Sequence, residues 1–448
     1  MGVDRASNSD LAFLAMDGGK RPLQFAAVLL LDRPLDPGVA ERFLAGRTAA
    51  VPRLRQKLVR TPPGCGRPIW VDDTAYDIRR QLTRISCAPP GDEQALLDAA
   101  LALLATPLPR DRPLWRAALV DGRAGGAGAV VLVLHHVLTD GLGGLALLAR
   151  LLDPRDEPSA VAEPRRPPAV PRLAADAIRG RLLAVRRLPR TWRLLRASMT
   201  AGGGLLPTRA APCSLLRPTG PRHQVVAAHA DLRRLRAAAH AHGGTVNAAL
   251  VAAVTGALHR LLTTRGERLE RLAVVLPVAG RSTTTADRLG NEVSPLLIDV
   301  PVTGTLGDRI SRIAGTVRQR RDLATGPPPI GLLGPLFRAA AALGGYHWFM
   351  NRQRRVHTLV SYVRGPEQPV RLAGATVDAV VPISIGESGN ISISFLALSY
   401  AGTLTVTAVA DPDRCLDLAV LSAALRAELD AVVSSTPPPD RSEGLVPR

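Results

Sequence analysis

The sequence is poor in aromatic residues, cysteine and lysine. Only 3% of its 448 residues are Phe, Trp or Tyr, so a hydrophobic core must be built from Leu, Val, Ile and Ala. The four cysteines lie far apart and form no CxxC pair, which argues against a zinc site and against a disulfide-rich fold. With 46% hydrophobic and 21% charged residues, the composition is typical of a globular protein that forms a core.

Acidic residues are too few to balance the basic ones, and the formal net charge is +19. Nearly all the basic side chains are arginine, since Lys20 and Lys57 are the only lysines. They are spread along the chain without a zinc-finger, RNP or basic-zipper pattern, so no nucleic-acid partner is expected. The charge favours instead a basic surface that faces anionic lipid or a phosphorylated cofactor.

Long apolar runs are also missing. No run of about 18 uncharged apolar residues occurs, which predicts that no transmembrane helix is present. The polar N-terminus MGVDRASNSD has no signal-peptide core, so the cytoplasm is the expected compartment. The last four residues, LVPR, look like the remnant of a cleavage linker and are left out of the fold prediction.

Strand and helix patterns mix in both halves of the chain, which predicts an α/β fold with two layered units. In the first half, strands are expected at 23–32, 68–73, 115–122 and 128–136, and helices at 37–58 (broken near Pro52), 92–108 and 141–153. In the second half, residues 223–232 are expected to form a strand that leads into a helix, and 272–281 a strand followed by a turn. A further strand is expected at 292–302, a segment that ends in a Gly-Pro turn at 358–366, a hairpin turning at Gly402 over 391–411, and helices at 245–262 and 417–433.

A Pro-rich polar stretch, residues 153–173, separates the two halves. We therefore divide the chain into an N-terminal subdomain (1–152), a linker with a basic helical connection (153–221), a C-terminal subdomain (222–438) and a tail (439–448).

Each of two further segments leaves two interpretations open. Residues 178–199, which Pro189 should kink, fit either a solvated basic connection or a surface helix that meets an anionic membrane. Residues 329–350 fit either a core or interdomain helix or a membrane-facing helix.

The stretch VLVLHHVLTDGLGGL (131–145) places two histidines at the end of a buried strand, with Asp140 four positions after the second. Adjacent strand residues point to opposite faces, so the doublet does not supply converging metal ligands, and no metal site is expected. A buried structural histidine is an alternative, but it does not explain the Asp-Gly that follows. A neutral imidazole at a strand end can act as a general base near neutral pH. Asp140 can brace the loop by pairing with an arginine, and Gly141 permits a backbone angle that other residues resist.

His135-His136-Val-Leu-Thr-Asp140-Gly141 resembles the HHxxxDG signature of the CoA-dependent acyltransferase superfamily. The flanking sequence selects the bacterial wax ester synthase/diacylglycerol acyltransferase family within it. PLPRDRPLWRAALVDG is similar to its PLDRSRPLW block, RPIWVDDTAYDIRRQL to its PvWvdDp.FDl block, and SNSDLAFLAMDGGK to its N-terminal D..FL..E block. TVNAALV, LPVAGR, LGNEVSP, SYVRGP and SYAG resemble further blocks in the same order, so the resemblance covers nearly the whole chain.

This resemblance implies two chloramphenicol-acetyltransferase-like subdomains, each a mixed β-sheet with flanking helices, and an active site at their interface. It places His135, His136 and Asp140 at the catalytic centre. His136 would be the general base for direct acyl transfer without an acyl-enzyme, and His135 would hold the strand end. Asp140 would be structural and paired with Arg281.

The resemblance also assigns supporting residues: Gly141, Arg281, Asn291 and Asn247. Asn291 would orient the substrate or the oxyanion, or else form only the turn after Gly290. Pro113, Leu114 and Trp115 are expected to be packing residues.

Acyl-CoA is the expected co-substrate, and no bound cofactor is expected. Diacylglycerol is the first acceptor considered and a long-chain alcohol the second; the motifs do not decide between them. A peripheral position at the inner membrane face or on lipid droplets fits such substrates. The alternatives are acyl transfer from CoA or a carrier protein to a specialised metabolite, and a non-catalytic lipid-droplet scaffold. The intact His-His and Asp-Gly argue against the scaffold.

Two blocks depart from the family pattern. The family's Asn-Asp pair is Asn247-Ala248 in this chain, which removes a carboxylate. The family's T-N-V-P-G-P block is SYVRGP, which places Arg364 before the Gly-Pro. The second change alters a segment expected to lie along the route of CoA or of the acceptor.

Overall fold

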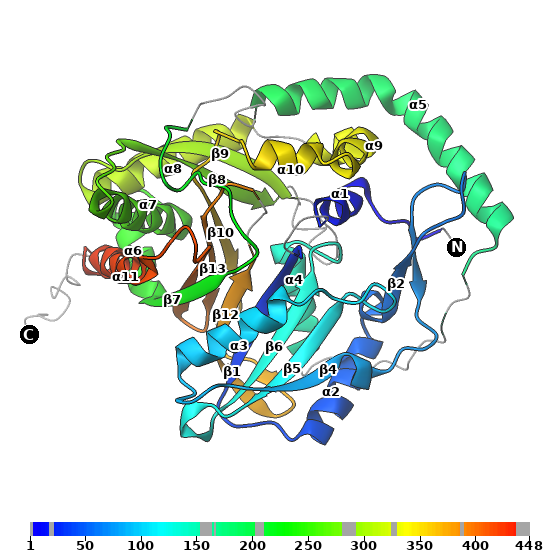
Figure 1. Ribbon diagram of the computed structural model, residues 1–448, viewed down its shortest axis with the longest axis horizontal. Helices are drawn as coiled ribbons and strands as arrows, with labels where there is room; N and C mark the ends of the chain where they lie inside the picture. Colours follow the sequence, from blue (N-terminus) through cyan, green and yellow to red (C-terminus); the bar gives the residue numbers. More distant parts are fainter. Residues whose placement is uncertain are drawn as a thin grey trace, which may run out of the picture.

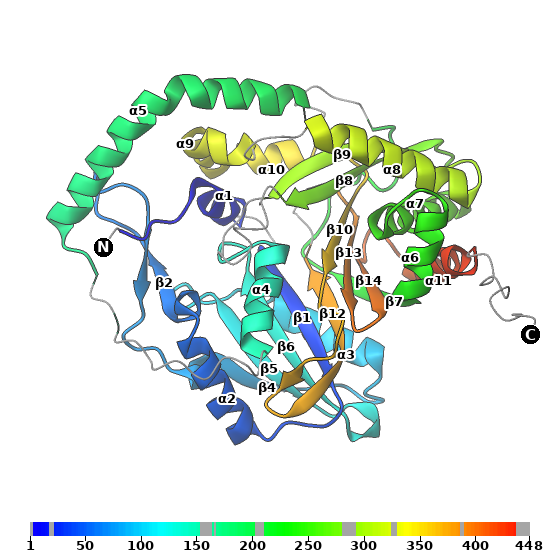
Figure 2. The same cartoon turned by 180° about the vertical axis from the view of Figure 1, so that it is seen from behind.

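The computed structural model describes residues 3–17, 22–152, 164, 167–201, 210–279, 293–323, 329–385 and 389–435. Within these residues the chain forms two lobes, each built around a six-stranded sheet (Figures 1 and 2). The strand order is β11-β12-β1-β6-β5-β4 in the first sheet and β7-β14-β13-β10-β8-β9 in the second. The predicted α/β fold with two units is confirmed.

The first lobe is centred on β6, whose eight residues are all buried between β1 and β5. This confirms the prediction of a strand covered on both faces. The lobe contains β1 (Gln24–Leu31), β4 (Leu82–Ser86), β5 (Trp115–Asp121) and β6 (Gly128–His135), the hairpin of β2 (Gln56–Val59) and β3 (Ile69–Asp72), and helices α1 (Asn8–Met16), α2 (Pro37–Ala49), α3 (Glu93–Ala105) and α4 (Gly141–Leu152).

The predicted helix from residue 37 and its break near Pro52 are confirmed, but the predicted helical continuation to residue 58 is wrong. Helix α2 ends at Ala49, Pro52–Arg55 form a 3-10 turn, and the chain continues as strand β2. Pro52 has no N–H group to donate, so it favours the first position of a new turn, and it begins the 3-10 turn instead of extending α2.

The second lobe is built around α7, an apolar helix packed against the sheet. This helix is long and apolar enough to cross a membrane by length and composition, but 78% of its apolar window is buried inside the protein, so it is a core helix. The lobe contains β7 (Gln224–Asp231), β8 (Arg271–Ala279), β9 (Val293–Pro301), β10 (Thr358–Arg364), β13 (Ile393–Tyr400) and β14 (Thr403–Ala410), with α6 (Leu232–Ala241), α7 (Val246–Thr264), α8 (Leu306–Leu323) and α11 (Leu418–Ser434). The hairpin of β13 and β14 turns at Ala401 and Gly402, both with positive φ, as the sequence predicted.

Two strands from the second half of the chain join the first sheet. Strand β12 (Ala375–Ser384) pairs antiparallel with β1, and β11 (Arg371–Leu372) pairs with β12 at the edge. The lobes are therefore tied together by backbone hydrogen bonds as well as by side-chain packing.

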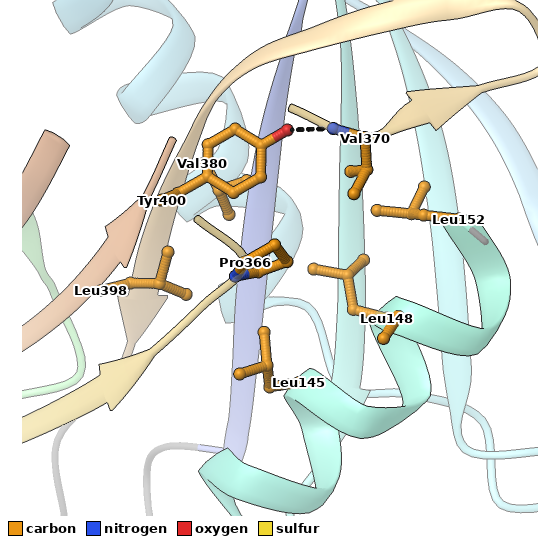
Figure 3. A pocket seen from close by; sticks show the side chains of 9 residues that line it. Leu145, Leu148, Leu152, Pro366, Val370, Val380, Leu398 and Tyr400 are labelled. Carbon is orange, nitrogen blue, oxygen red and sulfur yellow. Dashed lines mark hydrogen bonds between the residues drawn. The ribbon is translucent and has the colours of Figure 1, made fainter. Parts of the chain in front are cut away.

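Helix α4 packs against this crossing segment through an apolar seam. Its Leu145, Leu148 and Leu152 face Pro366 and Tyr400 around a void of about 10 Å³ (Figure 3). The Tyr400 hydroxyl accepts a hydrogen bond from the backbone N–H group of residue 370, at 2.8 Å. The void is too small for a substrate, so the seam joins the lobes and holds α4 in place.

A long helix, α5 (Val170–Ala201), curves over the outside of the molecule above α9 (Pro329–Ala342) and α10 (Gly345–Met350) (Figures 1 and 2). It continues through Pro189, and it begins earlier than predicted, inside the stretch taken as linker. Most of the predicted linker, residues 153–163 and 165–166, lies outside the described residues.

Candidate active site

The turn after β6 joins the strand to α4 through residues 136–140. The Leu138 N–H group donates to the His135 carbonyl oxygen at 3.0 Å, which closes the turn. Asp140 is 3% exposed, and its Oδ1 accepts a hydrogen bond from the Gly143 N–H group at 2.9 Å. Asp140 therefore caps the N-terminus of α4. The predicted strand, turn and helix are all present.

His135 is buried and held from both sides of its ring. Its Nδ1 accepts a hydrogen bond from the Val137 N–H group at 2.9 Å, so the ring proton lies on Nε2, which is 3.1 Å from Asp17 Oδ2. Asp17 also accepts from the Leu23 N–H group and from Arg110, each at 2.7 Å. Among the described residues, no group of three or more His, Cys, Asp or Glu is placed to hold a metal ion.

The hydrogen bonds to Asp17 stabilise its charged form. Burial raises the pKa of this carboxyl, but the hydrogen bond and charge of His135 and the donors Leu23 and Arg110 outweigh burial, so the pKa stands below its ordinary value. Asp17 thus acts as an ionised acceptor at the end of α1 that fixes His135.

His136 lies just past the end of the strand, between two aromatic rings. Its imidazole stacks on Phe13 with the ring centroids 5.4 Å apart, and it tilts against Phe25 with the centroids 4.8 Å apart. Its backbone N–H group donates to the Leu23 carbonyl oxygen at 3.0 Å. The ring is therefore positioned by α1 and β1 as well as by its own turn.

Burial lowers the pKa of His136 to about 4. The neighbouring His135 acts in the same direction, and a hydrogen bond with the Thr139 backbone acts against them. His136 is consequently neutral at physiological pH, which is the form that accepts a proton.

The two histidines have separate partners, but both reach α1. Phe13, against His136, and Asp17, against His135, are four residues apart and come from the same end of that helix. Strand alternation predicted opposite directions for the two rings, but the strand ends at His135, so alternation does not apply to His136. Asp17 was not singled out from the sequence, although it stands at the position of the Glu in the family's N-terminal D..FL..E block.

The prediction that Gly141 adopts an unusual backbone angle is wrong, since its φ lies outside the left-handed region. Its small size matters instead, because a Cβ atom there would lie 3.2 Å from Val363 Cγ2 of β10. A Cβ atom at Gly143 would lie 1.9 Å from Thr139 Oγ1. These two glycines allow the start of α4 to pack closely against Thr139 in the preceding turn and against β10 of the second lobe.

The remaining predicted site residues have different outcomes. Arg281 and Asn291 lie outside the described residues, so the pairing of Asp140 with Arg281 stays a prediction. Asn247 lines a pocket at the N-terminus of α7 in the second lobe. Trp115 is fully buried and its indole N–H group donates to the Leu54 carbonyl oxygen at 2.7 Å, which confirms its packing role.

A two-lobed α/β fold with an HHxxxDG turn that contacts both lobes defines the architecture of CoA-dependent acyltransferases. Residues 7–250 match the sequence model of the wax ester synthase/diacylglycerol acyltransferase catalytic domain, and residues 289–432 match that of the C-terminal domain of the same proteins. The chain therefore belongs to the wax ester synthase/diacylglycerol acyltransferase family and is an acyltransferase.

Known proteins of the same kind resemble the chain over its length. It is 29% identical over 445 residues to a putative diacylglycerol O-acyltransferase of Mycobacterium tuberculosis, a match that covers 93% of this chain and 87% of the relative. The wax ester synthase/diacylglycerol acyltransferase of Marinobacter aquaeolei has the same fold, with a TM-score of 0.64 at 20% identity over 96% of this chain and all of that one. So does the starter condensation domain of rhizomide synthetase solved with C8-CoA, with a TM-score of 0.63 at 14% identity over 99% and 98% of the two chains.

Proposed function

We propose that this protein is an acyl-CoA-dependent O-acyltransferase that esterifies diacylglycerol, a long-chain alcohol, or both, with His136 as the general base. The observation that carries the proposal is the His136 imidazole, neutral at physiological pH and packed between Phe13 and Phe25 at the end of β6. The aromatic surroundings suit an acceptor with an apolar body.

The proposed reaction needs one base and no covalent enzyme intermediate. His136 accepts the proton of the acceptor hydroxyl as that oxygen attacks the thioester carbonyl carbon. The tetrahedral intermediate collapses, the carbon–sulfur bond breaks, and the ester forms. The thiolate leaves readily, since thiols have a pKa of about 8.5, and the imidazolium returns the proton to it. Because burial makes this imidazolium acidic, the return of the proton is favourable.

A thiol-release assay with palmitoyl-CoA tests the acceptor. We expect release with diacylglycerol or hexadecanol to exceed release with water by about tenfold or more, because only the alcohols offer a nucleophile that the apolar site can hold. Release only with a polar acceptor would favour the specialised-metabolite alternative. No release with any acceptor would favour the non-catalytic scaffold.

We also propose that α5 holds the cytoplasmic enzyme at the surface of an anionic membrane or a lipid droplet. Five of its large apolar side chains are exposed and lie within one stripe at helical spacing: Ile178, Leu182, Val185, Leu188 and Trp192. The same helix carries eight arginines and a single acidic residue, Asp176, which pairs with Arg5 at 2.6 Å. An apolar stripe beside many cations is typical of a helix that lies in the membrane interface. Helix α9 contacts both α5 and α1, so this surface is linked to the helix that contacts His136.

Vesicle flotation tests this proposal. The triple variant Leu182→Ser, Val185→Ser, Leu188→Ser should bind vesicles that contain phosphatidylglycerol at least about tenfold more weakly, since each exposed leucine or valine buried in the interface contributes about 1.5 kcal/mol or more. Leu416→Ser, at an exposed apolar position outside α5, is the control. Equal binding of the triple variant and the wild type would contradict a role for α5.

A further inference from the structure

A second pocket, of about 380 Å³, lies in the second lobe where α6, α7, α8 and the end of β10 meet. It is lined by Arg236, His240, Thr245, Val246, Asn247, Ala248, Ala314, Val317, Arg318, Tyr362 and Arg364. Three guanidinium groups from three different elements thus converge there, and among these described lining residues none carries a carboxylate. The N-terminus of α7 also opens into it, and its backbone N–H groups add partial positive charge. Such a pocket fits an anion.

The positions at which this chain departs from its family's pattern gather in the same pocket. Ala248 stands where the family has Asp, Arg364 where it has Pro, and Tyr362 where it has Asn, and all three line the pocket. One carboxylate is removed and one guanidinium is added, so the pocket is more positive by two charges than the family pattern gives. These changes come from two blocks that lie far apart in sequence, and they line one cavity, which indicates a ligand contact.

We propose that this pocket binds the phosphate-bearing nucleotide end of the acyl-CoA donor, chiefly through Arg364, Arg236 and Arg318. The identity of the donor rests on the proposed function. Phosphate groups suit these residues because a guanidinium group donates two parallel hydrogen bonds to phosphate oxygens.

A carboxylate at the rim shows that two of these arginines can share one anion. Glu367 Oε1 lies 2.6 Å from Arg364 Nη2 and 3.8 Å from Arg236 Nη2. The Glu367 side chain is 63% exposed, so its ion pairs contribute little stability. A phosphate group, with more negative charge and more acceptor atoms, can displace it.

The strand that carries Arg364 connects the pocket to the candidate active site. Side chains alternate along β10, so Tyr362 and Arg364 face the pocket while Val363 faces Gly141 at the start of α4. The ladder between β8 and β10 covers only Thr358 and Leu359 within the described residues. On this proposal the pantetheine arm runs along β10 from the pocket toward the turn that holds His136.

Calorimetric titration with CoA, dephospho-CoA and pantetheine tests the proposal. Arg364→Gln should weaken CoA binding about tenfold, as expected for the loss of a charged hydrogen bond, and leave pantetheine binding unchanged. Arg233→Gln, on the exposed face of α6, is the matched control and should bind CoA as the wild type does. Equal CoA affinity of Arg364→Gln and the wild type would overturn the proposal. The proposal would also be overturned if Arg364→Gln lost binding to phosphatidic-acid vesicles but kept its affinity for CoA, since the pocket would then bind a lipid headgroup.

Ala248→Asp separates binding from folding. The residue is the third of α7, after the Thr245 cap, where a carboxylate favours the helix dipole. Ala248 is only 2% exposed, so burial of the new carboxylate opposes the favourable helix dipole and the nearby arginines. We expect a protein that still unfolds cooperatively and binds CoA severalfold more weakly, while Glu367→Gln should tighten CoA binding. If Ala248→Asp binds CoA as tightly as the wild type, the proposal fails. Because calorimetry needs no acceptor, a protein that acylates no alcohol can still pass this test, and an active diacylglycerol acyltransferase can fail it.

Discussion

His136→Ala is expected to lower kcat/KM for acyl transfer from palmitoyl-CoA by about 10²–10⁴-fold, the usual contribution of a general base, with little change in Tm. The ring contributes the proton acceptor, whereas the turn is held by backbone hydrogen bonds, His135 and Asp140. Thiol release under saturating acceptor measures the activity, and thermal unfolding measures the fold. His347→Ala, which removes an imidazole of α10 outside the turn, is the control and should keep full activity. Full turnover by His136→Ala would remove this residue from the chemistry.

The pH profile of the wild type reports on the same residue. Because burial lowers the pKa of His136 to about 4, its neutral form persists below the ordinary imidazole range, and kcat/KM should fall only as the pH approaches about 4. The stability of the fold should also decrease as the pH falls, for the same reason. Between about pH 6.5 and 4 the unfolded chain binds a proton at this position and the folded chain does not, so this residue makes the fold less stable as the pH falls. An acid limb centred near 6.5 would show that His136 is more exposed to solvent than this structure has it.

The local elements were predictable from sequence because their signals are local. The apolar run of β6, the turn at Gly402 and the helical period of α7 each specify one element without reference to the rest of the chain. The placement of β12 was not predictable in this way. Its alternation indicates a strand, but its partner β1 lies some 350 residues earlier, and nothing in either segment shows that a strand from the second half completes the first sheet.

The residues of the candidate active site differ in the same way, since only some of them carry a local sequence signal. His136 and Asp140 are marked by a spacing of a few residues, so the motif predicts them. Asp17 lies 118 residues from His135, and a single acidic residue at the end of a helix has no periodic pattern to identify it. The error at Gly141 has a similar cause. The group that a side chain at this position would crowd is Val363 of the other lobe, which the sequence of the turn alone cannot show.

Asp17→Ala should affect stability and catalysis together, because this carboxylate holds both neighbours of the base. It accepts from His135 on one side and from the Leu23 N–H group on the other, while the Leu23 carbonyl oxygen accepts from the His136 N–H group. Removing it leaves two buried donors without their acceptor, at about 1–3 kcal/mol each, so we expect a loss of about 2–6 kcal/mol in the free energy of unfolding. We also expect kcat to fall by about 10–100-fold, since a misplaced base loses its orientation.

Urea unfolding and the thiol-release assay measure these two effects, and Asp17→Asn distinguishes their causes. Asparagine keeps one acceptor oxygen but not the charge, so the losses of stability and of kcat should be intermediate. The acid limb of the kcat/KM profile, which reports His136, should stay at the same pH because Asp17 positions the base without titrating in the reaction. The Asp17 pKa is below its ordinary value, so the carboxylate contributes stability above the ordinary carboxyl pKa. That contribution is lost as the pH falls through the lower folded value, and Asp17→Asn should abolish this loss. Asp111→Ala, an exposed acid in the same region, should change neither measurement. An Asp17→Ala variant that unfolds and turns over like the wild type would show that the histidine turn is held by its own backbone and by α4, with no need for α1.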